Sequence, residues 1–314
     1  MWRSFFRLRQ RGILSINQRN SDFVLKYNPR KLYPLVDDKL RTKRLALQAG
    51  IAVPPLYTLI ETEHHVKKLK TLLQPYKDFV IKPARGAGGD GIIVITEQIF
   101  DRYRQINGKL LTVQELSYHL SCLLSGAYSL GGYPDYALIE QRVIVDPVFA
   151  NVSYEGVPDV RIITLLGYPA MAMVRLPTRL SGGKANLHQG AIGTGINLAT
   201  GVTLGGVFHN DTIDYHPDTL NPIVGIQVPD WDKILEIAAG CYELTGLGYL
   251  GVDIVLDKIH GPLMLELNAR PGLNIQIANR EGVVQRFRCI EERAALGKEP
   301  ILARVAFSKQ KFGH

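Results

Sequence analysis

The sequence predicts an α+β fold in which two lobes follow a short lead-in. Three observations predict it: helical periods alternate with short apolar runs, consecutive strand-like runs in the second half are typical of antiparallel strands, and a glycine-rich loop joins two strands in the first half. We assign residues 1–36 to the lead-in and 37–314 to one domain. Its two lobes cover about 57–140 and about 141–314.

Composition favours an ordinary globular protein. The chain has 314 residues, of which 46% are hydrophobic and 21% charged, so disorder is not expected. The net charge of +8 suits an anionic ligand, nucleic acid or a membrane surface and does not choose among them. Its three cysteines lack CxxC or Cys/His spacing, which argues against a disulfide framework or a zinc site and favours a reducing, cytoplasmic location.

The start of the chain, MWRSFFRLRQRG, mixes arginines with aromatic residues but lacks the continuous apolar core of a secretion signal. We expect a helix docked on the body by its aromatic side chains, and the alternative is peripheral contact with an anionic membrane. The sequence contains no run of about eighteen apolar residues, so no transmembrane helix is predicted. Residues 13–36 show no sustained helical period and predict an irregular lead-in.

Helices and strands are expected in the first lobe and in the residues that lead into it. A helix is expected from Asp37 to Gly50, because the aspartate suits a cap and the glycine a stop. Further elements follow in order: a strand from Tyr57, a helix over 63–75, strands over 78–83 and 91–96, and a helix over 111–125.

Three further runs, the first of them between the two lobes, predict consecutive antiparallel strands at 137–145, 159–167 and 169–177. The Gly- and Ser-rich stretch 179–197 exceeds the usual length of a structureless connection, and such loops are commonly functional. The remaining predicted elements are a helix over 231–246, strands over 249–257 and 261–268, and helix from about Asn274.

The first chemical motif is VIKPARGAGGDGIIVI. Glycines let backbone N–H groups approach phosphate oxygens, and Lys82 or Arg85 supplies positive charge, so the loop is a candidate lid over a triphosphate. It matches neither a P-loop nor a Rossmann turn, and the alternative is a hairpin loop without a catalytic role. The loop glycines are Gly86, Gly88, Gly89 and Gly91.

The second motif is a set of oxygen-bearing side chains on two predicted strands. Glu266 and Asn268 are two residues apart and so share a face, and Asp253 is an acid in an apolar run on the neighbouring strand. Buried acids need a positive partner, and magnesium bridging nucleotide phosphates is one. The alternative is a polar sheet face capped by Arg270 or Arg161.

Polar residues in the strand ALIEQRVIV indicate a hinge that could hold adenine, with Glu140 accepting from its amino group and Gln141 beside it. Arg161 and Arg175 carry guanidinium forks that suit a carboxylate or an acyl phosphate, although salt bridges on a sheet face are an alternative for each. Lys184, Asn186 and His188 lie together in the long loop. We do not assign His188 as a base, because a lone loop histidine is usually an ordinary hydrogen-bonding residue.

With these residues placed, the chain resembles the ATP-grasp ligases, and within them the RimK-like alpha-L-glutamate ligases and ligase-like proteins. The resemblance runs over nearly the whole chain, through RNSDFVLKYNPRKLYPLVDDKLRTK, VIKPARGAGGDGI, LIEQRVI, DVRI, ANLHQGA, GVDIVL and LELNARPGLNIQIAN. It implies an ATP-grasp fold, in which two α+β lobes clasp ATP.

The resemblance also implies roles for single residues. Lys39 and Lys82 would contact ATP phosphate, and the loop from Arg85 to Gly91 would fold over the nucleotide. The other implied roles are adenine binding by Glu140 and the backbone of Gln141 and Val143, ribose binding by Asp146, magnesium binding by Asp253, Glu266 and Asn268, and a place near the transferred phosphoryl group for Arg175 and Asn186.

One departure from the better-known ligases concerns the start of the chain. Those proteins carry a full N-terminal domain, whereas about thirty-five residues precede DDKL here. We therefore expect partner recognition in the loop 179–197 or in another subunit, and glutamate is only one candidate for the added amino acid.

The expected reaction is ATP-dependent amide formation by a magnesium enzyme, with two ions expected and Mn²⁺ as an alternative. Arg175 and Arg161 would steer a small-molecule or peptide carboxylate, and an amine would displace phosphate from the acyl phosphate. No nucleic acid partner is expected, and an oligomer is compatible with the sequence. The alternatives are a grasp-fold kinase that only transfers phosphoryl and a non-catalytic nucleotide-binding module.

Overall fold

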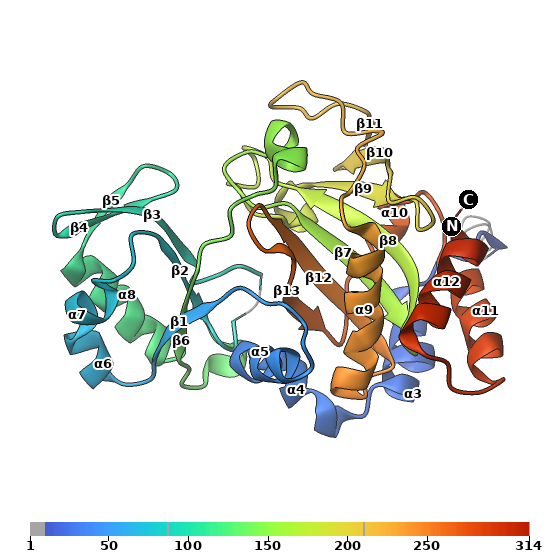
Figure 1. Ribbon diagram of the computed structural model, residues 1–314, viewed down its shortest axis with the longest axis horizontal. Coiled ribbons are helices and arrows are strands. Elements are labelled where there is room, and N and C mark those ends of the chain that lie inside the picture. Colours follow the sequence, from blue (N-terminus) through green and yellow to red (C-terminus); the bar gives the residue numbers. More distant parts are fainter. Residues whose placement is uncertain (1–9, 87, 210, 314) are drawn as a thin grey trace. The chain divides into compact units, whose positions relative to one another are not determined.

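The computed structural model describes residues 10–86, 88–209 and 211–313. Within them the chain forms two compact units (Figure 1). The seven-stranded unit contains residues up to Asp37, Leu45–Ala52 and the chain from Ile144 onward, and the six-stranded unit contains Asp38–Arg44 and Val53–Val143. The basic aromatic start of the chain, residues 1–9, lies outside the described residues.

The six-stranded unit is built on an antiparallel sheet with the strand order β1-β6-β2-β3-β4-β5. Its first and sixth strands in sequence pair side by side because the chain returns after the α8 helix. The strands are β1 (Leu56–Ile60), β2 (Phe79–Pro83), β3 (Ile93–Ile99), β4 (Arg102–Gln105), β5 (Leu110–Thr112) and β6 (Ala137–Glu140).

One face of this sheet packs against three helices, α6 (Glu63–Lys67), α7 (Leu69–Leu73) and α8 (Val113–Leu124). The helix α8 begins at a capping box, in which Thr112 accepts from the Glu115 N–H and the Glu115 carboxylate accepts from the Thr112 N–H. Its leucines enter the core beside strand residues of β2 and β6. This apolar packing leaves the opposite face of the sheet free for other residues.

The opposite face receives the first turn of α5 (Lys39–Gln48). There Leu40 packs with Ala84 and Leu138. Because side chains alternate along a strand, Glu140 shares this face with Leu138, and Lys82, which pairs with Leu138 across the strands, lies there as well. The alternation of the two strands therefore places two charged side chains on the α5 face, away from the apolar core.

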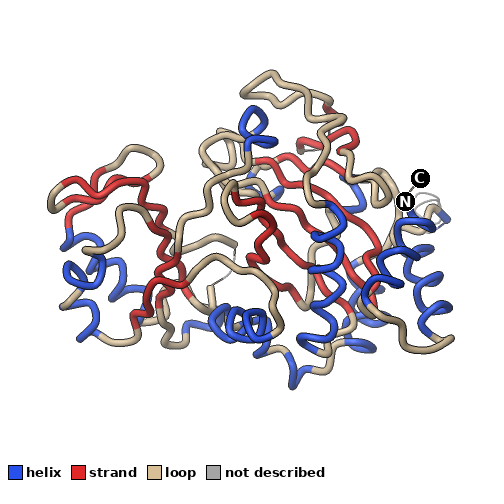
Figure 2. The backbone as a smooth tube through the Cα atoms, in the orientation of Figure 1, coloured by secondary structure: helices blue, strands red, loops and turns tan. Residues whose placement is uncertain are grey.

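The seven-stranded unit also has an antiparallel sheet, with the order β11-β10-β9-β8-β7-β12-β13. The backbone tube shows these strands as a separate group of red segments (Figure 2). They are β7 (Asp159–Leu165), β8 (Tyr168–Leu176), β9 (Ile192–Ile196), β10 (Thr203–Phe208), β11 (Asp211–Ile213), β12 (Tyr249–Asp257) and β13 (Gly261–Asn268).

Helices cover both faces of this sheet. On one face lie α9 (Trp231–Thr245) and α12 (Ile301–Phe312), which contact the central strands β7, β8 and β12 (Figure 1). The other face meets α10 (Ile275–Ala278) and, through Phe287 and Tyr249, the helix α11 (Val284–Ala294). Between these helices the second face carries the polar residues described below.

The residues expected to form an irregular lead-in are instead largely helical. The run contains α2 (Ile16–Gln18), the π-helix η1 (Arg19–Val24), α3 (Leu25–Tyr27), the 3₁₀-helix η2 (Arg30–Leu32) and α4 (Pro34–Asp37). Tertiary contacts explain the difference: the buried Phe23 ring packs on Phe287, with centroids 4.7 Å apart, and Asn28 is 2% exposed. Packing, rather than helical periodicity in the sequence, stabilises these short turns.

Two expectations about the second half were also wrong. The strand expected over 137–145 ends at Glu140, and β6 belongs to the other sheet, so it is not a neighbour of β7. The stretch 179–197 is not a structureless loop, because residues Ile192–Ile196 form β9 beside β8. Its glycines at 193 and 195 hid the strand from the sequence pattern. The strands β4, β5, β10 and β11 were not predicted.

Among the described residues, no helix combines the length and apolar character needed to cross a membrane. The three cysteines, Cys122, Cys241 and Cys289, are free thiols.

The lead-in helices are fixed to the sheet by Asn28. Its amide donates to the carbonyls of Tyr249 and Ala269 at 2.7 and 2.8 Å and accepts from the Tyr249 N–H at 2.9 Å. We expect Asn28→Ala to lower the free energy of unfolding by about 3 kcal/mol, because it leaves three buried backbone groups without a partner. Urea unfolding measures this, with the exposed Asn151→Ala as control. Equal stability of the two variants would show that water replaces the amide.

Candidate functional site

The six-stranded unit holds a buried cluster of two lysines and one glutamate, which we call the lysine–glutamate cluster: Lys43, Lys82 and Glu140. Lys82 Nζ lies 2.6 Å from Glu140 Oε2, and Lys43 Nζ lies 2.9 Å from Glu140 Oε1 and donates to the Pro54 carbonyl. None of the three is more than 5% exposed. One carboxylate between two ammonium groups leaves a net positive charge, which suits an anionic ligand.

Lys43 was missed by the sequence reasoning. It lies four residues after Lys39, on the same face of α5, and that spacing is the signal that could have identified it. Burial lowers the pKa of Lys43 to about 8, against the opposing effect of Glu140. That Glu140 accepts a hydrogen bond from the adenine amino group stays a prediction. In the structure its carboxylate forms ion pairs with the two lysines.

The glycine loop, residues 85–91, of which all but Ala87 are described, joins β2 to β3. Gly88 and Gly89 have φ values of +67° and +81°, a region that glycine adopts without strain. Lys39 donates from its side chain to the Gly86 carbonyl and from its backbone to the Ala84 carbonyl, the latter at 2.9 Å. The helix α5 therefore contacts the loop through a residue predicted to bind phosphate.

Arg85 occupies the start of this loop. Its guanidinium lies over the Tyr136 ring, 5.2 Å from the centroid, and its Nε lies 3.5 Å from Asp38 Oδ2. Its backbone N–H donates to Asp135 Oδ2 at 3.0 Å. Tyr136 in turn donates to Asp38. The predicted phosphate-binding side chain is thus half-exposed and held at the base of the loop.

The seven-stranded unit gathers a second polar group, which we call the acid–arginine cluster: Asp159, Arg161, Arg175, Asp253, Glu266 and Asn268. Strand register explains the grouping. Arg161 and Glu266 lie directly opposite Asp253 on its two neighbouring strands, and Asp159 lies opposite Arg175. Paired residues of adjacent strands point to the same face, so four strands direct these side chains to one side of the sheet.

Within the cluster, guanidinium forks hold the aspartates. Arg161 contacts both carboxylate oxygens of Asp253, at 2.6 and 2.5 Å, and Arg175 adds a contact at 2.9 Å. Arg175 also binds both oxygens of Asp159. Although burial acts to raise it, these arginines hold the pKa of Asp253 well below its ordinary value. The arginine cap that the sequence offered as an alternative is therefore present for Arg161.

The predicted metal-binding residues lie together on this face. Asn268 Nδ2 is 3.4 Å from Asp253 Oδ2 and 3.3 Å from Glu266 Oε1. Arg270, the other proposed cap, instead lies over the Tyr33 ring, 5.3 Å from its centroid. Among the described residues Glu266 forms no ion pair. Two carboxylates and one amide oxygen are the hard donors that Mg²⁺ prefers, and the residues present fit that ion.

No group of three or more His, Cys, Asp or Glu residues poised for a metal occurs in the described part of the chain. The predicted magnesium set contains two such residues, and its third member is the amide of Asn268. A criterion of three His, Cys, Asp or Glu residues therefore does not apply to this set. Asp159 joins the cluster without having been predicted. Its position two residues before Arg161 is the signal that it would share that face.

The predicted loop residues lie near the same face. Leu187 packs against Gly193, where a Cβ atom would come within 2.7 Å of it, and Gly193 lies opposite Arg175. The Asn186 side chain accepts from the His188 N–H at 3.0 Å and caps a short 3₁₀ turn, Leu187–Gln189. Lys184 is also in this segment. The structure does not join Asn186 or Lys184 to the acid–arginine cluster by a described contact.

The residues predicted around adenine and ribose have structural roles in the chain. The Gln141 N–H donates to the Pro55 carbonyl at 2.9 Å, and Val143 lies beyond the end of β6. Asp146 accepts from the Val148 N–H at 2.9 Å and caps the 3₁₀-helix η4 (Pro147–Val152). Their nucleotide contacts stay predictions.

Comparison with known families decides the classification. The family described as sugar-transfer associated ATP-grasp matches residues 18–292. The chain belongs to this ATP-grasp family. That membership confirms the ATP-grasp resemblance drawn from the sequence, and the structure has the α+β architecture expected from it. Comparison with curated proteins gave no match.

Solved structures resemble this ATP-grasp chain at low sequence identity. Pyruvate carboxylase T882A from Rhizobium etli, solved with acetyl coenzyme A, is 14% identical with a TM-score of 0.50, covering 88% of this chain and 20% of that one. A RimK domain ATP-grasp protein from Sphaerobacter thermophilus DSM 20745 is 15% identical with a TM-score of 0.45, covering 83% and 70%.

The ATP-grasp ligase PsnB, solved with a phosphomimetic precursor variant, Mg and ADP, is 13% identical with a TM-score of 0.44, covering 89% of this chain and 61% of that one. In another PsnB complex the covered share of PsnB is 64%. The chain therefore spans less than two thirds of PsnB.

The lowered pKa of Lys43 has a consequence for stability. Below about pH 8 the lysine is charged in both states, whereas between pH 8 and 10.5 the folded chain has lost a proton that the unfolded chain keeps. The contribution of Lys43 to the free energy of unfolding therefore rises with pH. We expect the difference in the free energy of unfolding between wild type and Lys43→Met to increase by on the order of 2 kcal/mol across this window.

Urea unfolding at several pH values measures the difference, and Lys67→Met, a change at an exposed lysine of α6, serves as control. A difference that is constant or falls with pH would show that Lys43 stays charged in the folded chain.

Proposed function

We propose that the chain is an ATP- and magnesium-dependent carboxylate–amine ligase that forms an amide or peptide bond through an acyl phosphate. The observation that carries the proposal is the acid–arginine cluster. It puts hard oxygen donors and two guanidinium forks on one sheet face, and a phosphoryl transfer to a carboxylate needs both. Membership in the ATP-grasp family supports the proposal.

We propose that Asp253, Glu266 and Asn268 hold magnesium, with two ions expected and Mn²⁺ as an alternative. Magnesium held there would supply positive charge against the negative charge that develops during transfer. Asp253 is ionised by its arginine partners, and Glu266 carries a carboxylate without an ion-pair partner in the described chain. The ligand charge needed for a divalent cation is therefore in place.

The six-stranded unit would bind the nucleotide. Lys82, with Glu140 fixing its ammonium group, is a charged donor for phosphate oxygens, and Lys39 and Arg85 add positive charge at the glycine loop. The N–H groups at Gly86, Gly88 and Gly89 can approach phosphate because no Cβ intervenes. We propose that adenine meets the strand end at Glu140, Gln141 and Val143, with Asp146 near ribose.

We propose that Arg175, and with it Arg161, orients the substrate carboxylate for attack on the γ-phosphate. Asp159 binds Arg175 through both oxygens and so fixes the plane of its guanidinium. Asn186 and Lys184 would act beside the phosphoryl group that is transferred. An amine would then attack the acyl carbon, and phosphate would leave. Coverage by the glycine loop would keep water from hydrolysing the acyl phosphate.

Two other functions remain as alternatives. A grasp-fold kinase would turn over ATP without an amine and would release a stable phosphorylated product. A non-catalytic nucleotide-binding module would bind ATP without turnover.

The deciding experiment incubates the chain with ATP, Mg²⁺ and a library of carboxylates and amines, follows phosphate release and identifies products by mass. Because the family is associated with sugar transfer, the library includes uronic acids and amino sugars beside amino acids and peptides. An amide whose formation requires both partners supports the ligase. ATP turnover that is independent of every amine would replace it with the kinase.

For the metal assignment we expect Glu266→Gln to lower phosphate release by on the order of 100-fold, because the neutral amide binds a divalent cation poorly. Circular dichroism and urea unfolding test that the variant is folded, and Glu292→Gln, an exposed change on α11, is the matched control. Undiminished turnover in the folded Glu266→Gln chain would remove Glu266 from the metal site.

For the carboxylate assignment we expect Arg175→Lys to lower kcat at least about 10-fold and to change the Kd for ATP less than about 2-fold. Lysine keeps the charge that Asp159 and Asp253 need but loses the planar fork. Single-turnover kinetics and calorimetry give the two quantities. A variant that weakens ATP binding alone would place Arg175 on the nucleotide instead.

A further inference from the structure

The two ends of the glycine loop are held by different kinds of contact. At its start the backbone is fixed by backbone partners: Ala84 donates to the Tyr136 carbonyl at 3.0 Å, and Arg85 accepts from the Leu130 N–H at 3.1 Å. An isolated bridge between Gly86 and Ser129 continues this pairing. The start of the loop thus extends the sheet pattern, and the side chains of Lys39 and Asp135 add contacts to Gly86 and Arg85.

The far end depends on side chains. The Gly91 carbonyl lies 2.9 Å from His119 Nε2, which projects from α8. Gly91 has φ +75°, and a Cβ atom there would lie 2.6 Å from Tyr128 Cγ, so the Tyr128 ring lies directly against the backbone. A histidine donor and an aromatic surface therefore set the path of the chain where the loop returns to β3.

The hydrogen-bond partners determine the tautomer of His119. A carbonyl oxygen can only accept, so Nε2 carries the proton that is donated to Gly91. Nδ1 is then the acceptor and lies 3.4 Å from the Tyr128 hydroxyl, which can donate to it. Burial lowers the pKa of His119, in keeping with a neutral ring. Tyr128 thus orients the ring that holds Gly91.

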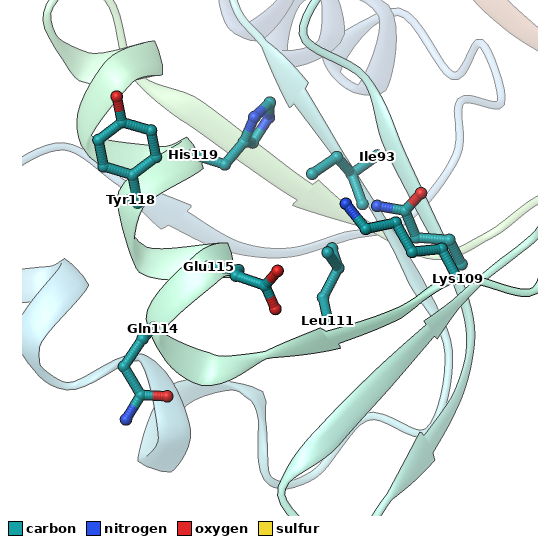
Figure 3. A pocket seen from close by; sticks show the side chains of 8 residues that line it. Ile93, Lys109, Leu111, Gln114, Glu115, Tyr118 and His119 are labelled. Carbon is teal, nitrogen blue, oxygen red and sulfur yellow. The ribbon is translucent and has the colours of Figure 1, made fainter.

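His119 is mounted on a rigid support but is not itself part of the core. Leu116 and Leu120 on α8 are fully buried, whereas His119 is half-buried at the wall of a pocket of about 540 Å³. Figure 3 shows His119 and Tyr118 leaving the helix in different directions, and Ile93 and Leu111 projecting from the neighbouring strands. Substitution of His119 therefore removes a loop contact without opening the apolar core.

We propose that His119, oriented by Tyr128, is a positioning residue that fixes the Gly91 end of the glycine loop in the geometry that binds nucleotide phosphate. The inference rests on the proposed function, because it assigns a role in ATP use to a residue that does not touch ATP. His119 acts through the backbone of the loop. Its Nε2 donor sets the position of the Gly91 peptide, and hence the direction of the neighbouring loop N–H groups.

Hydrogen exchange of the ATP-free protein tests the anchor by itself. His119→Phe keeps a ring but loses the donor, and His119→Gln keeps a donor close to the position of Nε2. We expect amides of residues 88–92 to exchange roughly 3- to 10-fold faster in His119→Phe, close to wild type in His119→Gln, and faster to a smaller degree in Tyr128→Phe. The exposed His64→Phe on α6 is the matched control. Unchanged exchange in folded His119→Phe would overturn the proposal.

Kinetics with MgATP test the role in nucleotide use. We expect His119→Phe to raise the KM for ATP roughly 3- to 10-fold with kcat within about 2-fold, and His119→Gln to recover most of the wild-type KM. A purely structural role would lower the active fraction, and hence kcat, without changing KM. Faster exchange together with an unchanged KM would therefore overturn the positioning role.

The two arms separate this inference from the proposed function. If wild type neither binds nor turns over MgATP, the ligase proposal fails and the positioning role fails with it, although exchange still establishes or refutes the contact to Gly91. If wild type forms an amide and His119→Phe matches it in both KM and exchange, the ligase stands and this inference alone is wrong.

Discussion

Compensation of buried carboxylates by cations on the same sheet face is the constraint on which this structure depends. Asp253 is fully buried on a central strand, and an ionised acid there is strongly destabilising unless guanidinium groups neutralise it. Arg161 and Arg175 do so from two neighbouring strands. In the other unit the cations are the groups that need compensation, since one acid, Glu140, lies between two buried lysines. The pairings between strand residues require a particular register, whereas Lys43 pairs with Glu140 from the helix α5.

These two clusters differ in the sign of the charge that remains. The lysine–glutamate cluster has one cation in excess, which suits a polyanionic ligand. The acid–arginine cluster contains three carboxylates and two guanidinium groups, and Glu266 is the acid that no described cation pairs with. A phosphate chain complements the residual charge of the first cluster, and a divalent cation complements that of the second.

The loops of both units are held in place by residues from other parts of the chain. The glycine loop needs positive φ values and close backbone approach, so its own residues contribute few side-chain contacts, and its ends must be fixed from outside. Lys39 contacts one end and His119 the other. The segment around Asn186 is likewise attached through Leu187, which packs on the bare backbone of Gly193 beside Arg175. In both units, glycine therefore allows another residue to pack directly against the backbone.

The sequence by itself determined the strand faces and the chemistry on them. Period-two alternation put Glu266 with Asn268, and the resemblance of motifs over nearly the whole chain was enough to recognise an ATP-grasp chain. Only the tertiary structure decided which strands are neighbours. Pairing of β12 with β7, and of β7 with β8, brought Arg161, Arg175 and the unpredicted Asp159 to Asp253. It also made β9 a strand despite its glycines and folded the lead-in on Phe287. Such contacts join residues far apart in the chain, so no local pattern encodes them.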